Sequence, residues 1–133
     1  MGVRCRGIRG ATTVESNSAD AILGATTELL VELMRANDLR VDDVASAFFT
    51  TTVDLNAEFP AVAARQLGWR DVALLCGHEM DVPGSLPMCL RILLHANTEK
   101  GPQDIVHVYL RGATVLRTDL SEKRDEKTEA TSP

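Results

Sequence analysis

The 133-residue sequence has few aromatic side chains, which make up 4% of the chain: one tryptophan, one tyrosine and three phenylalanines. Proteins that bind single-stranded nucleic acid stack bases on aromatic rings, so this composition disfavours that class of partner. Basic residues are also outnumbered, with 14 lysines and arginines against 19 aspartates and glutamates and a net charge of −5. A polyanionic partner held by overall charge is therefore not expected.

Cysteine is scarce as well: Cys5, Cys76 and Cys89 are scattered, and no two form a CxxC pair. An odd, scattered set predicts neither a disulfide framework nor a zinc site, and it favours a reducing, cytoplasmic setting. No apolar run has the length of a membrane span, and the N-terminus has no apolar signal region. We therefore expect a cytoplasmic protein with no metal site, no membrane partner and no nucleic-acid partner.

Strand and helix patterns that alternate along the chain predict one mixed α/β domain over residues 1–118. An apolar stripe from Ile22 to Met34 predicts a helix that is capped by Asn17 or Ser18 and ends at Asn37. β-branched and aromatic residues predict strands, and leucine spacing predicts a third helix. The expected strands are 3–14, 44–53, 72–76, 105–110 and 113–117, the last two forming a hairpin, and the further helices are 60–65 and 86–97. Residues 119–133 are highly charged, so we expect a flexible tail.

Two arginines have contexts that favour a functional role. Strand alternation sends Arg4 and Arg6 to one face and Arg9 to the other, which suggests a separate task for Arg9. Arg91 lies in the expected third helix between apolar residues. If its guanidinium points inward it needs an anionic or oxygen-rich partner, because an unpaired buried charge is costly. The alternative for Arg9 is an arginine that is simply solvated on its strand, and the alternative for Arg91 is an arginine at the rim of the core.

Four further side chains are candidates because of where they fall in the predicted strands and loops. Cys76 ends an apolar strand and Glu79 lies in the turn that follows, at a position where α/β folds commonly place binding groups. Tyr109 and Arg117 fall on the last two expected strands and could clamp a carboxylate. The alternatives are that Cys76 is a buried thiol, that Glu79 is a solvated loop carboxylate, and that Tyr109 and Arg117 form a packing pair on the sheet surface.

Taken together, these residue types offer several guanidinium groups, a carboxylate, a thiol and a phenol, without an activated nucleophile. Metal-ligand spacings, a Ser-His-Asp pattern, a P-loop and a dinucleotide fingerprint are missing from the sequence. Such a set can hold a small, multiply anionic ligand in one shape. A reaction that needs only positioning and electrostatic help, such as a unimolecular pericyclic rearrangement, suits it.

Four segments resemble the monofunctional, AroH-type chorismate mutases in the same order: RGIRGATTVE, DLNAEFPAVAARQLGW, CGHEMDVPGSLPMCLR and DIVHVYLRGATVLRTDL. The resemblance covers roughly residues 4–120. It implies a homotrimer with a pseudo-α/β-barrel arrangement and three active sites at the subunit interfaces. It also implies an isomerase that converts chorismate to prephenate by a Claisen rearrangement, in phenylalanine and tyrosine biosynthesis, with no cofactor or metal.

The resemblance also implies roles for the candidate residues. Arg91 would hydrogen-bond the ether oxygen whose negative charge grows as the C–O bond breaks. Glu79 would accept from the ring hydroxyl and balance charge on the electron-poor side, with Cys76 beside it. Arg9 and Tyr109 would hold the side-chain carboxylate.

The remaining positions carried over from the family complete the expected site. Arg117, with Leu116 nearby, would cover the other carboxylate. Three positions resemble those supplied by the neighbouring subunit, namely Phe59, Ala61 and Arg65. Two residues depart from the family pattern, since Val62 stands where some members have lysine and Leu75 where some have threonine. Their side chains offer no polar contact, although the backbone at Leu75 still could.

Two other functions fit parts of the same pattern. One is a trimeric imine deaminase of the reactive-intermediate deaminase type, which would release ammonia and leave chorismate untouched. The other is a non-catalytic trimeric module that binds an aromatic-pathway metabolite without converting it. The full residue set argues against both, because a pure binder has little need for an arginine against an ether oxygen.

Overall fold

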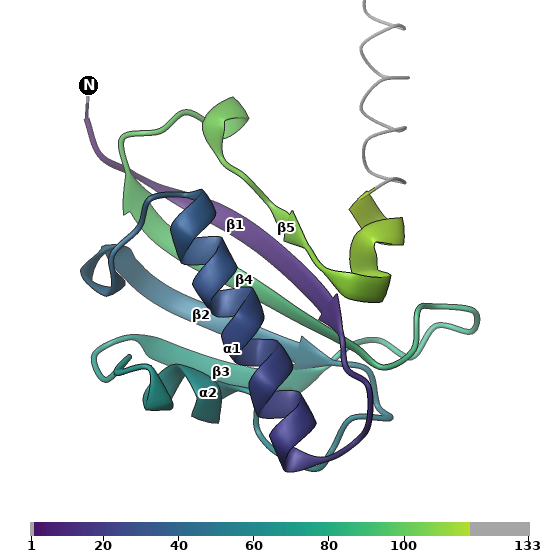
Figure 1. Cartoon of the computed structure of the whole chain (residues 1–133). Helices are drawn as coiled ribbons and strands as arrows, with labels where there is room; N and C mark the ends of the chain where they lie inside the picture. The colour runs from purple at the N-terminus through teal and green to yellow at the C-terminus, as the bar shows by residue number, and fades with distance from the viewer. Residues whose placement is uncertain (1, 118–133) are drawn as a thin grey trace, which may run out of the picture.

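The computed structural model describes residues 2–117, and Figure 1 shows one twisted sheet crossed by a long helix. Five strands form the sheet in the order β3-β2-β4-β1-β5. Their bounds are β1 Arg4–Thr13, β2 Val44–Thr51, β3 Ala73–His78, β4 Cys89–Thr98 and β5 Val108–Tyr109. The helices are α1 Ala19–Ala36 and α2 Ala61–Gln66, with 3-10 helices η1 Val41–Asp43, η2 Pro102–Asp104 and η3 Arg111–Ala113.

The sheet is mixed because β4 runs against its neighbours. It pairs antiparallel with both β1 and β2, whereas β1 with β5 and β2 with β3 pair parallel. Four of the five described strands therefore share one direction. Their carboxyl ends meet at one edge of the sheet, and the first residues of β4 lie at that same edge.

The first helix is confirmed almost as the sequence predicts. The Ser18 side chain accepts a hydrogen bond from the backbone N–H of Ala21, which caps the first turn, and Asn37 is the C-cap. The apolar stripe is buried against the sheet. Gly10 of β1 permits this close packing, because a Cβ there would lie 2.9 Å from the Leu33 Cδ1 atom.

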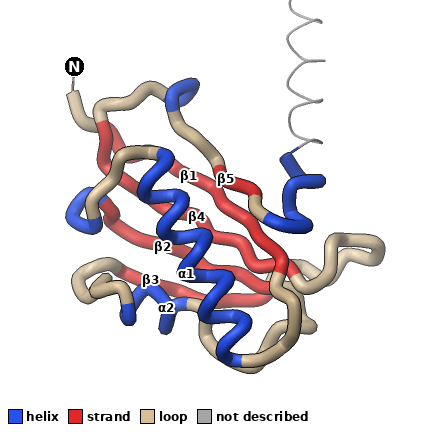
Figure 2. The backbone as a smooth tube through the Cα atoms, in the orientation of Figure 1, coloured by secondary structure: helices blue, strands red, loops and turns tan. Residues whose placement is uncertain are grey.

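The sheet has one covered face and one open face (Figure 2). On the covered face, alternate residues of the central strands pack under α1 and α2; they include Ile8, Ala47, Phe49, Leu90, Ile92 and Leu94. In the described part of the chain no helix lies over the opposite face of the central strands (Figure 1). Because side chains alternate along a strand, Arg9 and Arg91 both lie on this open face.

The helix predicted over residues 86–97 is wrong, since the chain forms β4 there. The leucines at 86, 90, 93 and 94 fit a helical period, but Leu90, Ile92, Leu94 and Ala96 also alternate with a period of two. The strand pattern prevails because it buries all four of these side chains under α1. Antiparallel pairing on both sides of β4 then satisfies its backbone.

The predicted C-terminal hairpin is also wrong. Of the expected strand 105–110, only Val108–Tyr109 pairs, and it pairs parallel with β1. The expected strand 113–117 is helical instead, following η3. Arg111, in the expected tight turn, has a φ of 51° and begins η3 rather than a hairpin. The predicted tail over 119–133 lies outside the described residues, and the domain boundary at 118 stays a prediction.

Candidate active site

A row of side chains crosses the open face near the carboxyl ends of the strands. The pairing register places Thr50 of β2 opposite Arg91 of β4, Arg91 opposite Ala11 of β1, and Ala11 opposite Tyr109 of β5. Paired residues point to the same side of a sheet, so these four side chains are neighbours on one surface. Ala11 is small and leaves space between the guanidinium and the phenol. The row therefore brings together groups from four strands.

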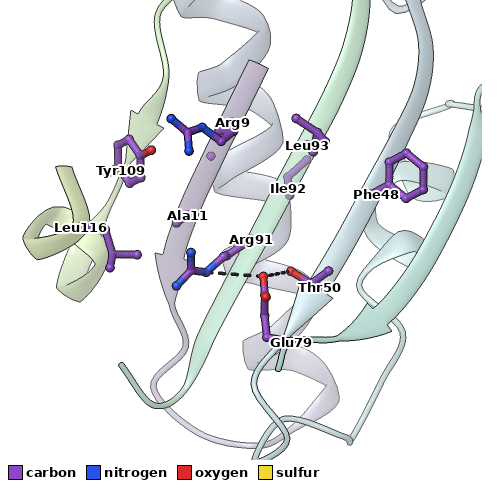
Figure 3. Close-up of a pocket in the computed structure, with 11 residues that line it drawn as sticks. Arg9, Ala11, Phe48, Thr50, Glu79, Arg91, Ile92, Leu93, Tyr109 and Leu116 are labelled. Atoms are coloured by element: carbon purple, nitrogen blue, oxygen red, sulfur yellow. Dashed lines mark hydrogen bonds and ion pairs between the residues drawn. The ribbon is translucent and has the colours of Figure 1, made fainter. Parts of the chain in front are cut away.

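Glu79 approaches this row from the end of β3. Its backbone N–H donates to the carbonyl of Thr51 at 2.8 Å, which fixes the first residue after the strand. Its Oε1 atom lies 3.6 Å from the Arg91 Nε atom (Figure 3). The Arg91 side chain is 42% exposed, yet its Nε atom is buried and has no hydrogen-bond partner among the described residues. A buried N–H donor without an acceptor is uncommon, and here the Glu79 carboxylate lies just beyond hydrogen-bond distance of it.

Thr50 is a site residue that the sequence analysis missed. Its hydroxyl donates to the Glu79 Oε1 atom at 2.7 Å, and this is the same oxygen that faces Arg91 (Figure 3). A threonine in a β-rich segment is ordinary, so nothing in the local sequence marks it. Only the strand register, which places Thr50 across from Arg91, gives it a role. We infer that its hydroxyl holds the carboxylate away from full contact with the guanidinium.

Replacing Thr50 with valine is expected to lower kcat about tenfold, because a hydrogen bond to a charged group stabilises by roughly 1.5–3 kcal/mol. Valine keeps the shape and strand preference of threonine, and the freed carboxylate can then close onto Arg91 and occupy it. Steady-state kinetics of Thr50→Val and Thr50→Ser measure the effect. Thr50→Ser retains the hydroxyl and should stay within about twofold of the unaltered protein. A Thr50→Val protein with full turnover would show that the hydrogen bond is incidental.

The cationic end of the site is formed by β1 and β5. Arg9 comes two residues before Ala11 on β1 and so lies on the same face of the sheet, and Tyr109 lies on the neighbouring strand β5 (Figure 3). The backbone N–H of Arg9 donates to His107 Nδ1 at 2.9 Å, which ties the two strands together before their short ladder begins. The structure therefore brings three of the predicted site residues, Arg9, Tyr109 and Arg91, to one surface.

These side chains surround a cavity of about 580 Å³, which we term the open-face hollow. Apolar groups complete its walls, with Phe48 and Leu93 on one side and Leu116 on the other (Figure 3). Its lining is Arg9, Gly10, Ala11, Phe48, Thr50, Glu79, Arg91, Ile92, Leu93, Tyr109 and Leu116. A volume of this size suits a small organic ligand.

Cys76 is not brought to Glu79 within one chain. It pairs with Phe49, whose side chain is in the core, so its thiol lies on the covered face while Glu79 lies on the open face. Cys76 lines a second cavity of about 350 Å³, together with Phe59 and His78. The His78 imidazole interacts with the Thr51 hydroxyl at 3.1 Å and does not reach the open-face hollow.

The other predicted positions lie around the rim or away from the hollow. Leu116 lines it, whereas the exposed Arg117 does not. Leu75 pairs with Phe48 and is 60% exposed on the open face. Three predicted positions on or next to α2 lie outside the hollow: Phe59 is exposed, Ala61 is buried and Arg65 is exposed.

A second thiol lies unexpectedly near the site. Cys89 opens β4 on the same strand face as Arg91 and is fully buried. Burial raises the pKa of the Cys89 thiol, and the nearby Arg91 guanidinium only partly opposes that shift. The thiol is therefore neutral at physiological pH and packs as a small apolar group behind the guanidinium.

The arrangement can bind and polarise an anion, and no serine, cysteine, lysine or histidine is among the described residues that line the hollow. Within residues 2–117, no group of three or more histidine, cysteine, aspartate or glutamate side chains could hold a metal ion. No helix in this part of the chain is long and apolar enough to cross a membrane. Arg9 at one end and the Arg91–Glu79 pair at the other can hold a small anionic ligand and polarise a bond within it.

Comparison with known proteins agrees with this geometry. A family model described as chorismate mutase type I matches residues 5–120. The chain is 51% identical over 117 residues to chorismate mutase AroH of Thermus thermophilus, covering 86% of this chain and 95% of the relative. It is 44% identical over 117 residues to chorismate mutase AroH of Bacillus subtilis, covering 87% and 92%.

A solved structure is similar as well. The chorismate mutase from Clostridium thermocellum superposes with a TM-score of 0.82 at 54% identity, covering 83% of this chain and 98% of that one. The family model, the two relatives and the solved structure each cover most of the chain. The chain therefore belongs to the chorismate mutase type I family and is an isomerase with chorismate mutase activity.

Proposed function

We propose that the protein converts chorismate to prephenate in the open-face hollow by holding the substrate compactly and stabilising its transition state. The observation that carries this proposal is the Arg91–Glu79 pair, in which a buried Nε–H has no hydrogen-bond acceptor among the described residues. Chorismate has two carboxylates, an ether oxygen and a ring hydroxyl. The ether oxygen, the ring hydroxyl and one carboxylate have complementary groups in the lining of the hollow, and for the second carboxylate we assign Arg117, which follows the lining residue Leu116.

Charge separation along the breaking bond explains the placement of Arg91 and Glu79. As the C–O bond lengthens, negative charge gathers on the ether oxygen and the ring becomes electron-poor. Arg91 donates to that oxygen, and the Glu79 carboxylate accepts from the ring hydroxyl on the opposite side. Groups fixed before the reaction stabilise developing charge without reorganising, which is the largest contribution available to such a site.

Binding in the compact conformer falls to the remaining groups. Arg9 and Tyr109 hold the side-chain carboxylate, and Arg117 with Leu116 covers the second carboxylate. Holding two ends of one molecule close together lowers the entropy cost of a rearrangement that joins them. The rearrangement only shifts electrons among the substrate's own bonds, with no proton, electron or group passed to another molecule, so the proposed reaction uses neither a cofactor nor a metal.

We further propose that the working unit is a homotrimer with sites between subunits. Large apolar side chains are exposed on the open face and next to α2, with Leu75 60% and Phe59 67% exposed, and exposed apolar side chains of this kind are typical of surfaces that another protein covers. Phe59, Ala61, Arg65 and Cys76 do not line the hollow of their own chain, and we assign them to the site of a neighbouring subunit. The free cysteines and the biosynthetic reaction favour the cytoplasm.

Purified protein incubated with chorismate and EDTA should produce prephenate, followed by NMR, at a rate that EDTA does not change. Because no group must gain or lose a proton, turnover should vary little around neutral pH. Native mass spectrometry of the same sample should show a trimer. Binding without conversion, or release of ammonia from an imino acid while chorismate is untouched, would contradict the proposed reaction. A monomer that turns over chorismate would contradict the shared site alone.

A further inference from the structure

Arg111 joins three parts of the chain through its guanidinium. Its Nη1 atom lies 3.2 Å from Glu15 Oε1, in the loop after β1. On α1, its Nε atom donates to Glu28 Oε1 at 3.3 Å and its Nη2 atom to Glu28 Oε2 at 3.2 Å. The two carboxylates raise the pKa of Arg111, with the hydrogen bonds to Glu28 as the main cause. A paired fork of this kind fixes direction as well as distance.

The backbone at this corner is held in a conformation that few side chains adopt. Arg111 has a φ of 51°, in the left-handed region, which costs energy for a residue with a side chain. The Gly112 N–H donates to the Thr13 hydroxyl at 3.0 Å, and a Cβ on Gly112 would lie 3.0 Å from the same oxygen. The Leu110 N–H donates to the Ala11 carbonyl at 2.9 Å. Several contacts thus keep the corner in place against this strain.

The segment fixed by this corner forms one wall of the open-face hollow. Tyr109 comes two residues before Arg111 and Leu116 five residues after it, and both line the hollow (Figure 3). The strand that carries Tyr109 is only two residues long, so its ladder supplies few backbone hydrogen bonds. The wall therefore depends on contacts outside the ladder for its position.

We propose that Arg111 is a positioning residue, which sets the wall formed by Tyr109 and Leu116 through its ion pairs with Glu15 and Glu28. It does not touch the substrate; it acts through the two residues that do. This inference rests on the proposed function, because it takes chorismate as the ligand of the hollow. A wall held in place before binding reduces the ordering that the ligand must impose, so losing the anchor should weaken binding more than it slows the bond rearrangement.

A matched control is available on α1, the helix that carries Glu28. Arg35 pairs with Glu32 one turn along α1, and this pair joins no separate segments. Arg111→Ala and Arg35→Ala each remove one exposed guanidinium, but only Arg111→Ala releases the wall. Alanine has the same Cβ as arginine, so the strain at position 111 is unchanged.

Steady-state kinetics should separate the two variants. Arg111→Ala is expected to raise the KM for chorismate about fivefold to tenfold with kcat within about twofold, because uniform binding is lost and transition-state contacts are kept. Arg35→Ala should change neither constant. Arg111→Lys, which can still pair with one carboxylate, should recover part of the loss. A normal KM in Arg111→Ala, or equal effects in Arg111→Ala and Arg35→Ala, would overturn the proposal.

Coupling and exchange measurements complete the test. Glu28→Gln should raise KM less than Arg111→Ala does, and adding it to Arg111→Ala should have little further effect, because both act through one contact.

Amide hydrogen exchange over residues 109–117 should quicken in Arg111→Ala but not in Arg35→Ala. Unchanged exchange there would also overturn the anchor. If the unaltered protein failed to convert chorismate, the proposed function would fall, and exchange would still decide whether Arg111 anchors the wall.

Discussion

Replacing Arg91 with alanine is expected to lower kcat by about a hundredfold to a thousandfold or more, with a smaller change in KM. Its guanidinium lines the hollow beside Glu79, with its Nε atom 3.6 Å from Glu79 Oε1, and that buried Nε–H has no hydrogen-bond acceptor among the described residues. Loss of one donor aimed at a developing oxyanion typically costs about 3–4 kcal/mol in the barrier. Steady-state kinetics with chorismate measure both constants.

Lysine at position 91 should fail substantially as well, because a single ammonium cannot reproduce the two-sided contact of a guanidinium. The matched control is Arg4→Ala, which removes an exposed arginine from the other face of β1 and should leave both constants unchanged. Near-normal turnover in Arg91→Ala, with Arg4→Ala equally active, would remove Arg91 from the centre of the mechanism.

The second large effect is expected at Glu79. Glu79→Gln keeps an oxygen that can accept from the Thr50 hydroxyl, but it removes the negative charge across from Arg91. We expect kcat to fall about a hundredfold, because the electron-poor side of the transition state loses its counter-charge. The substitution separates the contribution of charge from that of shape, which alanine would not do.

Glu32→Gln provides the comparison, since Glu32 lies on α1 and pairs only with Arg35 in the described chain. Its kinetic constants should match those of the unaltered protein. Should Glu79→Gln retain full kcat, hydrogen bonding rather than charge at this position would be the requirement, and the electrostatic mechanism would need revision.

Local sequence patterns predicted the first half of the fold well. The α1 stripe and its Ser18 cap are local signals, and the face of Arg9 follows from the alternation of side chains along one strand. At β4 the leucine spacing suited both a helix and a strand. Burial beneath α1 decided between them, and that burial depends on residues far away in the sequence.

Spacing along the chain was a poor guide to proximity at two points. Cys76 and Glu79 are three residues apart, which in an extended chain sends their side chains to opposite faces, so their closeness in sequence did not bring them together. Thr50 and Arg91 are far apart in sequence yet opposite each other in the sheet. Strand register is set by the whole sheet, so no local pattern could have revealed Thr50.

The placement of β4 between β1 and β2 has a consequence for how activity is gained during folding. Thr50 lies on β2 and Ala11 on β1, and β4 separates these two strands; Tyr109 lies on β5, which pairs with β1. The row is therefore complete only when β4 has inserted between β2 and β1. Such distant pairings are slow to form, because loop closure must come before they are stabilised. Catalytic activity should therefore return on refolding only when β4 pairs with both β1 and β2. A chain that has formed only its first helix and early strands should have no catalytic activity.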